Sequence, residues 1–304
     1  MRLPAILETL HQRPISHPHL SWGAFLPVDR GGASGQGDRR GCACIPGPAR
    51  IGRGLAGMTV PGADPTGLSV GEIHVWTARL VDGDRATAGQ LGILCREERA
   101  RAAQFAFERD RARFIQAHGI VRRILAGYCD TDPATLSFAR NRHGKPALAL
   151  RGNGPNLQFS VSHSGDCCML ALRLDHAIGV DIEKLRELPQ AAAIAQSYFT
   201  AAESAVLAAL QGTTQRDAFF LLWTHKEAAV KALGIDLAAH LGRLEFERDP
   251  AGQLRLAAWD GDTSVTQRWS ILRLDAEPGY VAALASERPI QSLSLRNWNG
   301  TGAD

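Results

Sequence analysis

FFLLWTHKEAAVKALG, residues 219–234, is a mostly apolar stretch that carries Lys226, Glu227 and Lys231 in its second half. In a helix, Glu227 and Lys231 lie four residues apart on one face, with the carboxylate on the N-terminal side, the order that a helical ion pair prefers. Such pairs are common on exposed helices of any function. The stretch therefore predicts a helix with Phe219 and Trp223 in its core face. Its charges alone leave open a surface ion pair or a functional site.

The length and composition are those of an ordinary globular protein. The 304 residues, of which 45% are hydrophobic, suffice for one large domain or two modest ones. The net charge of +3 without a dense Lys/Arg tract favours anionic small molecules or acidic partners over nucleic acid. No stretch approaches the roughly 20 apolar residues of a membrane span, and the opening residues lack a signal-peptide pattern. We expect a cytoplasmic protein.

The six cysteines, at positions 42, 44, 95, 129, 167 and 168, fit neither a disulfide framework nor a paired zinc motif. They are expected to be reduced thiols. Cys42 and Cys44 could form a metal cluster with His17 and His19. Their spacing matches no usual zinc site, and the segment is rich in glycine.

Residues 1–70 are rich in turn formers and lack a sustained hydrophobic period, which predicts a mostly disordered extension. Met58 opens a short polar leader that runs directly into an alternating strand pattern. Our hypothesis is that residues 1–57 are a dispensable extension or an upstream misreading of the start. Peptides from before Met58 in mass spectra of the native protein would contradict it.

A regular pattern begins at Glu72, where alternating residues predict a strand, and an arginine-rich helix is expected from about Arg96 to Tyr128. Further strands are predicted at 157–164, 167–174, 177–185, 244–249, 253–259, 268–275 and 279–286, and helices at 200–212 and 215–234. This order predicts an α+β protein with two similar halves, residues 71–180 and 181–290, a tail at 291–304 and a cleft between the halves. The similar placement of helices 113–127 and 219–234 weakly indicates duplication.

The stretch IGVDIEKLRE, residues 178–187, places two carboxylates close together. In a strand, Asp181 and Glu183 project from one face, while Val180 and Ile182 point to the opposite, buried side. Two adjacent like charges are costly without a cation, and Mg²⁺ would offset that cost. The alternative is a strand that ends in solvent, where exposed acids need no partner. The motif alone favours this alternative.

The motif GVDIE, followed about forty residues later by WTHKEAAVK, resembles the paired signature of the surfactin-type 4′-phosphopantetheinyl transferases, which prime carrier proteins of peptide and polyketide synthases. HVWTARL (74–80), RARF (111–114), HGKP (143–146) and FSVSHSG (159–165) occur in the family's order and rough spacing. The resemblance covers about residues 72–285.

The resemblance implies transfer of the phosphopantetheine arm of coenzyme A to a carrier-protein serine with Mg²⁺, releasing adenosine 3′,5′-bisphosphate, as in holo-[acyl-carrier-protein] synthases. Asp181, Glu183 and Glu227 would be the metal ligands. Glu227, or a water held near Glu183, would take the serine proton, and Lys231 would contact the pyrophosphate and assist the departing phosphate. Lys226 is a weaker candidate for a phosphate contact and is expected to be solvated.

The resemblance also implies contacts to coenzyme A. Gly144, Lys145 and Pro146 match the nucleotide-binding motif, and Ser162 and His163 match phosphate contacts. Arg101 and Arg113 are candidates for the 3′-phosphate, although a solvated basic face explains either arginine equally well. Relatives often have an arginine near the place of His118, which leaves a phosphate or helix contact there open.

Two other functions fit part of the pattern. One is a Mg²⁺-dependent enzyme acting on another nucleotide pyrophosphate, although the sequence has no GxxxxGK[ST] motif. The other is a non-catalytic carrier-binding module, although all three carboxylates and Lys231 are present. The expected partners are coenzyme A and an acidic apo acyl or peptidyl carrier protein, attracted by the basic helix at 96–128. We expect a monomer that binds neither nucleic acid nor membrane.

Overall fold

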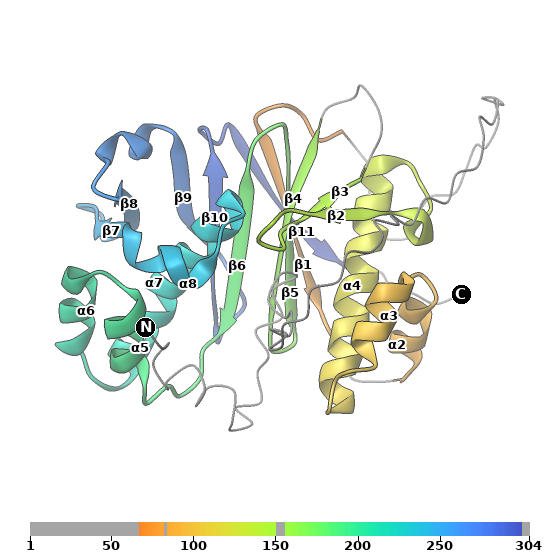
Figure 1. The fold of residues 1–304 in the computed structure, drawn as a ribbon, viewed down its shortest axis with the longest axis horizontal. Coiled ribbons are helices and arrows are strands. Elements are labelled where there is room, and N and C mark those ends of the chain that lie inside the picture. Colours follow the sequence, from red (N-terminus) through yellow and green to blue (C-terminus); the bar gives the residue numbers. More distant parts are fainter. Residues whose placement is uncertain (1–66, 82–83, 150–155, 300–304) are drawn as a thin grey trace, which may run out of the picture.

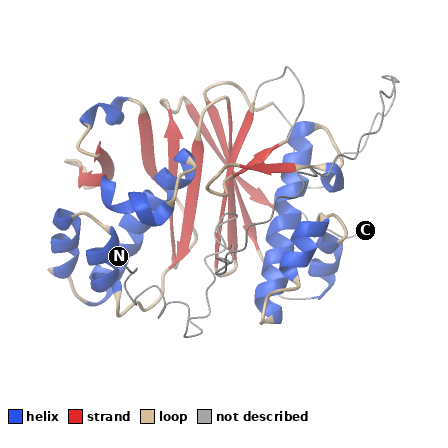
Figure 2. Ribbon diagram, in the orientation of Figure 1, coloured by secondary structure: helices blue, strands red, loops and turns tan. Residues whose placement is uncertain are grey.

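The computed structural model describes residues 67–81, 84–149 and 156–299. Figure 2 shows the strands gathered in the middle of the molecule with helices on both sides. The expected extension at 1–57, the hypothetical start at Met58 and the possible cluster of Cys42 and Cys44 with His17 and His19 lie outside the described residues. Within them, no helix is both long and apolar enough to cross a membrane.

The first half is a four-stranded sheet with the strand order β11-β1-β5-β4. Its strands are β1 (Glu72–Arg79), β4 (Leu157–Ser164), β5 (Cys167–Leu174) and β11 (Ser292–Trp298). β5 is antiparallel to β1 and β4, and β11 is parallel to β1. The long helix α4 (Glu108–Cys129) packs on this sheet, with α2 (Asp84–Leu91) and α3 (Arg96–Ala102) beside it (Figure 1).

The second half repeats the arrangement of one long helix on a sheet. The sheet has the order β6-β10-β9, from β6 (Ile178–Lys184), β9 (Trp269–Leu274) and β10 (Tyr280–Glu287). The helix α7 (Gly212–Leu233) packs on β6 and β10. Around it lie α5 (Ala191–Tyr198), α6 (Ala201–Ala208), α8 (Leu237–His240) and the hairpin of β7 (Leu244–Arg248) and β8 (Leu254–Trp259).

The two sheets pack face to face between the two long helices. Their shared core contains Val75 of β1, Met169 of β5, Val180 and Ile182 of β6, and Leu284 of β10. Because β5 is covered by α4 on one side and by the second sheet on the other, nearly all of its residues are buried, and its first six residues, 167–172, are a continuous apolar run. The protein therefore has the predicted α+β fold with two halves.

Gly179 fixes how closely α7 approaches β6. A Cβ at this position would lie 2.0 Å from the backbone oxygen of Ala228 and 2.4 Å from the nitrogen of Ala232. Both atoms belong to the α7 backbone, so no other residue fits here without moving the helix. The glycine of the IGVDIE motif thus sets the contact that brings α7 against the strand with the two carboxylates.

Three predictions of local structure differ from what the structure shows. The helix expected at 96–128 is two helices, because Phe105 packs on Phe114 and folds α3 back against α4. The expected tail at 291–304 contains β11, which pairs with the distant strand β1. The expected boundary at 180/181 falls inside β6. Two short strands, β2 (Phe138–Arg140) and β3 (Pro146–Leu148), form a hairpin between α4 and β4.

Candidate active site

The strand β6 carries two buried carboxylates at the junction of the two halves. Asp181 and Glu183 are 2% and 3% exposed, and the alternating residues Val180 and Ile182 point into the core between the sheets. The strand alternation predicted from the sequence is therefore confirmed. The expectation of acids exposed at a strand end, the alternative interpretation, does not hold for this strand.

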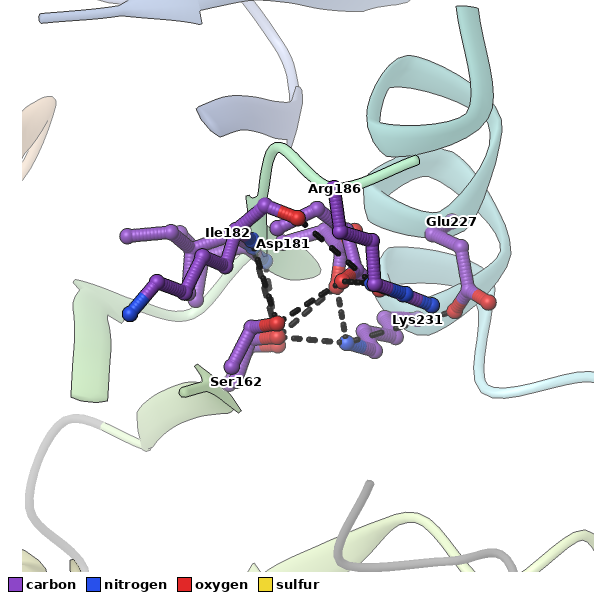
Figure 3. Close-up of polar contacts among 11 residues, drawn as sticks. Ser162, Asp181, Ile182, Arg186, Glu227 and Lys231 are labelled. Atoms are coloured by element: carbon purple, nitrogen blue, oxygen red, sulfur yellow. Dashed lines mark hydrogen bonds and ion pairs between the residues drawn. The ribbon is translucent and has the colours of Figure 1, made fainter. Parts of the chain in front are cut away.

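The helix α7 brings Lys231 into contact with Asp181. The Nζ atom of Lys231 lies 2.6 Å from Oδ1 of Asp181 and 3.0 Å from Oγ of Ser162, which is on β4 (Figure 3). Oε2 of Glu227, one turn earlier on α7, lies 4.0 Å from the same Nζ. Three elements, β4, β6 and α7, thus meet around one ammonium group.

Two serines of β4 donate hydrogen bonds to the carboxylates of β6. Oγ of Ser162 lies 2.7 Å from Oδ1 of Asp181, and Oγ of Ser164 lies 2.8 Å from Oε2 of Glu183. Nη1 of Arg186 lies 3.5 Å from the same oxygen of Glu183. Neither Ser164 nor Arg186 was predicted from the sequence. The signal for Ser164 was the alternation of serines in FSVSHS.

Burial dominates the electrostatics of these groups. Burial and the nearby Glu183 raise the pKa of Asp181 against the effect of Lys231 and Ser162. Burial disfavours the charged form of Lys231, yet the carboxylates of Asp181 and Glu227 raise its pKa above the ordinary value. Oδ2 of Asp181 is buried, and none of the described residues gives it a hydrogen bond. The junction therefore has a buried carboxylate oxygen directed at no donor, which costs free energy until a cation or donor reaches it.

The oxygen donors of this junction suit Mg²⁺, which prefers carboxylates, waters and phosphate oxygens. The unpartnered Oδ2 of Asp181 is a donor that such an ion would satisfy. Among the described residues, however, no three His, Cys, Asp or Glu side chains are grouped closely enough to hold a metal ion. The Lys231 ammonium lies between Asp181 and Glu227 instead. Joint ligation by Asp181, Glu183 and Glu227 stays a prediction.

Lys226 is buried rather than solvated, so the sequence interpretation of this residue was wrong. Its Nζ lies 2.8 Å from Oε2 of Glu203 on α6 and donates hydrogen bonds to the carbonyl oxygens of Leu241 and Leu244. Its side chain is 0% exposed. Helical spacing places Lys226 and Lys231 on different faces of α7, and only the tertiary structure shows that α6 and β7 cover the first of them.

The HGKP segment joins the two halves on a second side of the junction. Nζ of Lys145 donates to the carbonyl oxygens of Ile178 on β6 and Ala232 on α7, at 3.0 and 2.9 Å. Burial lowers the pKa of Lys145 to about 8. Gly144 has a φ of +87°, which the turn before β3 requires, and the buried Pro146 begins β3. The predicted contact of this segment with a nucleotide remains a prediction.

The remaining predicted residues lie around these elements. His163 is half-buried on β4 and alternates with Ser162, so the two side chains point to opposite faces of the strand. Arg101 ends α3 with its guanidinium over the ring of Phe114, 5.6 Å away, and Arg113 is on α4. Nη2 of Arg101 and Nε of Arg113 are buried without hydrogen-bond partners in the part of the chain that the structure describes. The structure does not place either arginine in contact with the Asp181 cluster.

Arg140, which was not predicted, stands near Arg101. Burial and the charge of Arg140 lower the pKa of Arg101. Two neighbouring cations with an unpartnered buried N–H favour an anion at this place.

His118 is a helix contact, because its Nδ1 lies 3.0 Å from Oε1 of Glu98 on α3.

Comparison with known proteins identifies the family of this chain. Two family profiles match, "4'-phosphopantetheinyl transferase, N-terminal" over residues 85–174 and "4'-phosphopantetheinyl transferase superfamily" over residues 177–285. The 4'-phosphopantetheinyl transferase HetI of Nostoc sp. is 32% identical over 214 residues, which are 70% of this chain and 87% of that protein. The chain belongs to the 4′-phosphopantetheinyl transferase family.

Two further relatives of this phosphopantetheinyl transferase come from a mammal and a bacterium. The human L-aminoadipate-semialdehyde dehydrogenase-phosphopantetheinyl transferase is 32% identical over 162 residues, which are 51% of this chain and 52% of that protein. The 4'-phosphopantetheinyl transferase ffp of Bacillus subtilis is 27% identical over 199 residues, 66% of this chain and 84% of that protein. The first family match ends at the end of β5 and the second begins directly before β6.

Proposed function

We propose that this phosphopantetheinyl transferase moves the 4′-phosphopantetheine arm of coenzyme A to a serine hydroxyl of an apo carrier protein, with Mg²⁺, and releases adenosine 3′,5′-bisphosphate. The observation that carries the proposal is the junction of β4, β6 and α7, where Asp181, Glu183, Glu227 and Lys231 converge. An unpartnered buried oxygen of Asp181 supports a cation there. The family supplies the reaction class.

The acids of the junction would hold the metal. Asp181, Glu183 and Glu227 would ligate Mg²⁺, which neutralises charge on the pyrophosphate when bound. Glu227 would accept the proton of the carrier serine as the serine oxygen bonds to phosphorus and the bond to the bridging pyrophosphate oxygen breaks. The Lys231 ammonium, held by Asp181, would stabilise the charge that collects on the leaving phosphate.

The phosphates of coenzyme A that do not react need cations away from this junction. Arg101 and Arg113 are proposed for the 3′-phosphate, supported by their unpartnered buried N–H groups and by Arg140 near Arg101. The segment Gly144–Pro146, with Lys145, and Ser162 with His163 are proposed to line the nucleotide. The acceptor would be an acyl or peptidyl carrier protein of a fatty-acid, polyketide or peptide synthase. The enzyme would bind this carrier as a monomer.

The test is the intact mass of an apo carrier protein incubated with the enzyme, coenzyme A and Mg²⁺. A gain of roughly 340 Da, the mass of one phosphopantetheine arm, is expected only when enzyme and Mg²⁺ are both present. Asp181→Asn and Glu227→Gln should each slow the transfer at least about 100-fold. Glu187→Gln is the matched control, because this carboxylate follows β6 but is 87% exposed.

The opposite result is equally specific. No mass gain on peptide, polyketide and fatty-acid carriers would favour an enzyme acting on another nucleotide pyrophosphate. Wild-type rates in Asp181→Asn and Glu227→Gln would contradict the assignment of the metal ligands.

A further inference from the structure

The strand β4 has a serine at every second position, Ser160, Ser162 and Ser164, so that all three hydroxyls lie on one face. Each accepts a hydrogen bond from a backbone N–H of β6: Ser160 from Val180, Ser162 from Ile182 and Ser164 from Lys184, at 3.1, 3.3 and 3.1 Å. We call these three serines the serine ladder.

The serine ladder joins the two sheets where their backbones do not pair. β6 is an edge strand of its sheet, with β10 on the other side, so its outward N–H groups need acceptors. The hydroxyls of β4 supply them at a spacing that matches the two-residue repeat of both strands. The seam between the halves is therefore built from side-chain oxygens rather than from a backbone ladder.

The hydroxyl proton gives the ladder a second function at two of its three positions. Ser162 donates to Asp181 at 2.7 Å and Ser164 donates to Glu183 at 2.8 Å. In each case the carboxylate belongs to the residue directly before the one whose N–H the serine accepts. At Ser160 the corresponding residue is Gly179, which has no side chain. One repeating geometry thus meets a glycine, an aspartate and a glutamate in turn.

A hydroxyl that accepts from a fixed N–H has a restricted direction for its single proton. Ser164 can then satisfy only one oxygen of Glu183, and it fixes the torsion angles of that long side chain. Groups that hydrogen-bond a metal ligand from behind orient it, and their loss weakens metal binding. Ser162 also contacts Lys231, whereas the hydroxyl of Ser164 hydrogen-bonds, among the described residues, to β6 alone.

We propose that Ser164 is a positioning residue, which holds the Glu183 carboxylate in the orientation that the cation of this site requires. This inference rests on the proposed function, because the proposed cation is Mg²⁺. Ser160 belongs to the same ladder but contacts no carboxylate of residues 67–81, 84–149 and 156–299, so it provides the matched comparison within the chain.

The first experiment measures Mg²⁺ affinity by titration calorimetry on wild type, Ser164→Ala, Ser160→Ala and Ser164→Thr. Both alanine variants lose a bond from a backbone N–H of β6, and Ser164→Ala also loses the bond to Glu183, so both should melt at a lower temperature. Only Ser164→Ala should bind Mg²⁺ about 10- to 100-fold more weakly. Its transfer rate should recover as Mg²⁺ is raised, and Ser164→Thr, which restores the hydroxyl, should restore the affinity. Equal weakening in the two alanine variants would reduce Ser164 to a structural role and overturn the proposal.

The second experiment needs no metal, so it separates this inference from the proposed function. Crystal structures of the metal-free variants should show the Glu183 carboxylate displaced in Ser164→Ala and unchanged in Ser160→Ala. A Glu183 that keeps its position in Ser164→Ala overturns the positioning role, whatever the calorimetry gives. A wild type that binds no Mg²⁺, with Glu183 displaced in Ser164→Ala, would leave the positioning role standing and overturn the metal in the proposed function.

Discussion

Two faces of the helix α7 each bury a lysine, and the surroundings of the two lysines differ. On one face Nζ of Lys226 meets Glu203 and the carbonyl oxygens of Leu241 and Leu244, so its three hydrogens have three acceptors. On the other face Lys231 bonds to Asp181 and Ser162, keeps 16% of its side chain exposed, and lies beside an Asp181 oxygen without a partner. A buried charge whose partners are all present offers nothing to a ligand, while the Asp181 oxygen without a partner among the described residues is available for one.

The largest effect on this comparison is expected from Lys226→Met. The change leaves the buried carboxylate of Glu203 without its cation, and breaking one partner of a buried ion pair costs about 3–5 kcal/mol. Urea denaturation should show a loss of that size in the free energy of unfolding. Adding Glu203→Gln should recover part of the loss, since no unpaired charge then remains. A loss below about 1 kcal/mol, the range measured for surface ion pairs, would contradict a buried ion pair between Lys226 and Glu203.

The first half contains a second buried charge whose partners are all present, Glu98, which contacts His118 and Arg122. A variant of Glu98 tests whether such a buried cluster also contributes to stability. Burial opposes ionisation of Glu98, yet the hydrogen bond with His118 and the charges of His118 and Arg122 lower its pKa from 4.5 to about 2. A lowered carboxyl pKa stabilises the fold above pH 4.5, and this contribution is lost as the pH falls toward 2.

Because burial lowers the pKa of His118, this imidazole is neutral at pH 7, so we expect Glu98→Gln to lower the free energy of unfolding at pH 7 by at most about 3 kcal/mol, the value of the full shift. The difference from wild type should shrink between pH 4.5 and pH 2. Urea curves over this pH range measure it. The transfer rate per folded molecule should change little, and a gap that stays constant over the range would refute the electrostatic origin.

The variant Lys231→Met tests the other face of α7, where the Asp181 oxygen lies. Removing the ammonium should lower kcat/KM for transfer by about 100-fold, which equals about 2.7 kcal/mol of transition-state free energy. The loss of stability should be clearly smaller than in Lys226→Met, because Asp181, whose pKa burial already raises, can take up a proton once the ammonium is gone. Steady-state transfer kinetics and urea denaturation on the same preparations separate the two effects. Similar profiles for the two lysine variants would remove the distinction between the faces.

The smallest effect concerns Lys145, which contacts the backbone of both β6 and α7. Burial lowers its pKa from 10.5 to about 8, so the unfolded chain holds this proton more tightly than the folded chain. Stability must then rise with pH between 8 and 10.5 through this group. Relative to Lys145→Met, wild type should gain about 1 kcal/mol between pH 7 and pH 9. Parallel pH curves for the two proteins would contradict a charged, buried Lys145.

Much of the site could be predicted from local periodicity. The two-residue repeat of β6 placed Asp181 and Glu183 on one face, and the helical repeat of α7 placed Glu227 and Lys231 on one face. The same repeat in β4 contains the serine ladder, whose role was not predicted, because alternating serines are equally typical of a solvent-exposed face. Only the opposing residues of β6 give those hydroxyls an acceptor and a donor.

The local sequence predicted most of the strands and the long helix α7, the residues that share a face in them, and the family to which the chain belongs. Only the tertiary structure shows which faces are covered. There Lys226 forms a buried ion pair with Glu203, Lys145 donates to two backbone carbonyls, and β11 pairs with the distant strand β1. The physical reason is that periodicity depends on neighbouring residues in the chain. Burial and pairing depend instead on contacts between residues far apart in sequence, which no local pattern specifies.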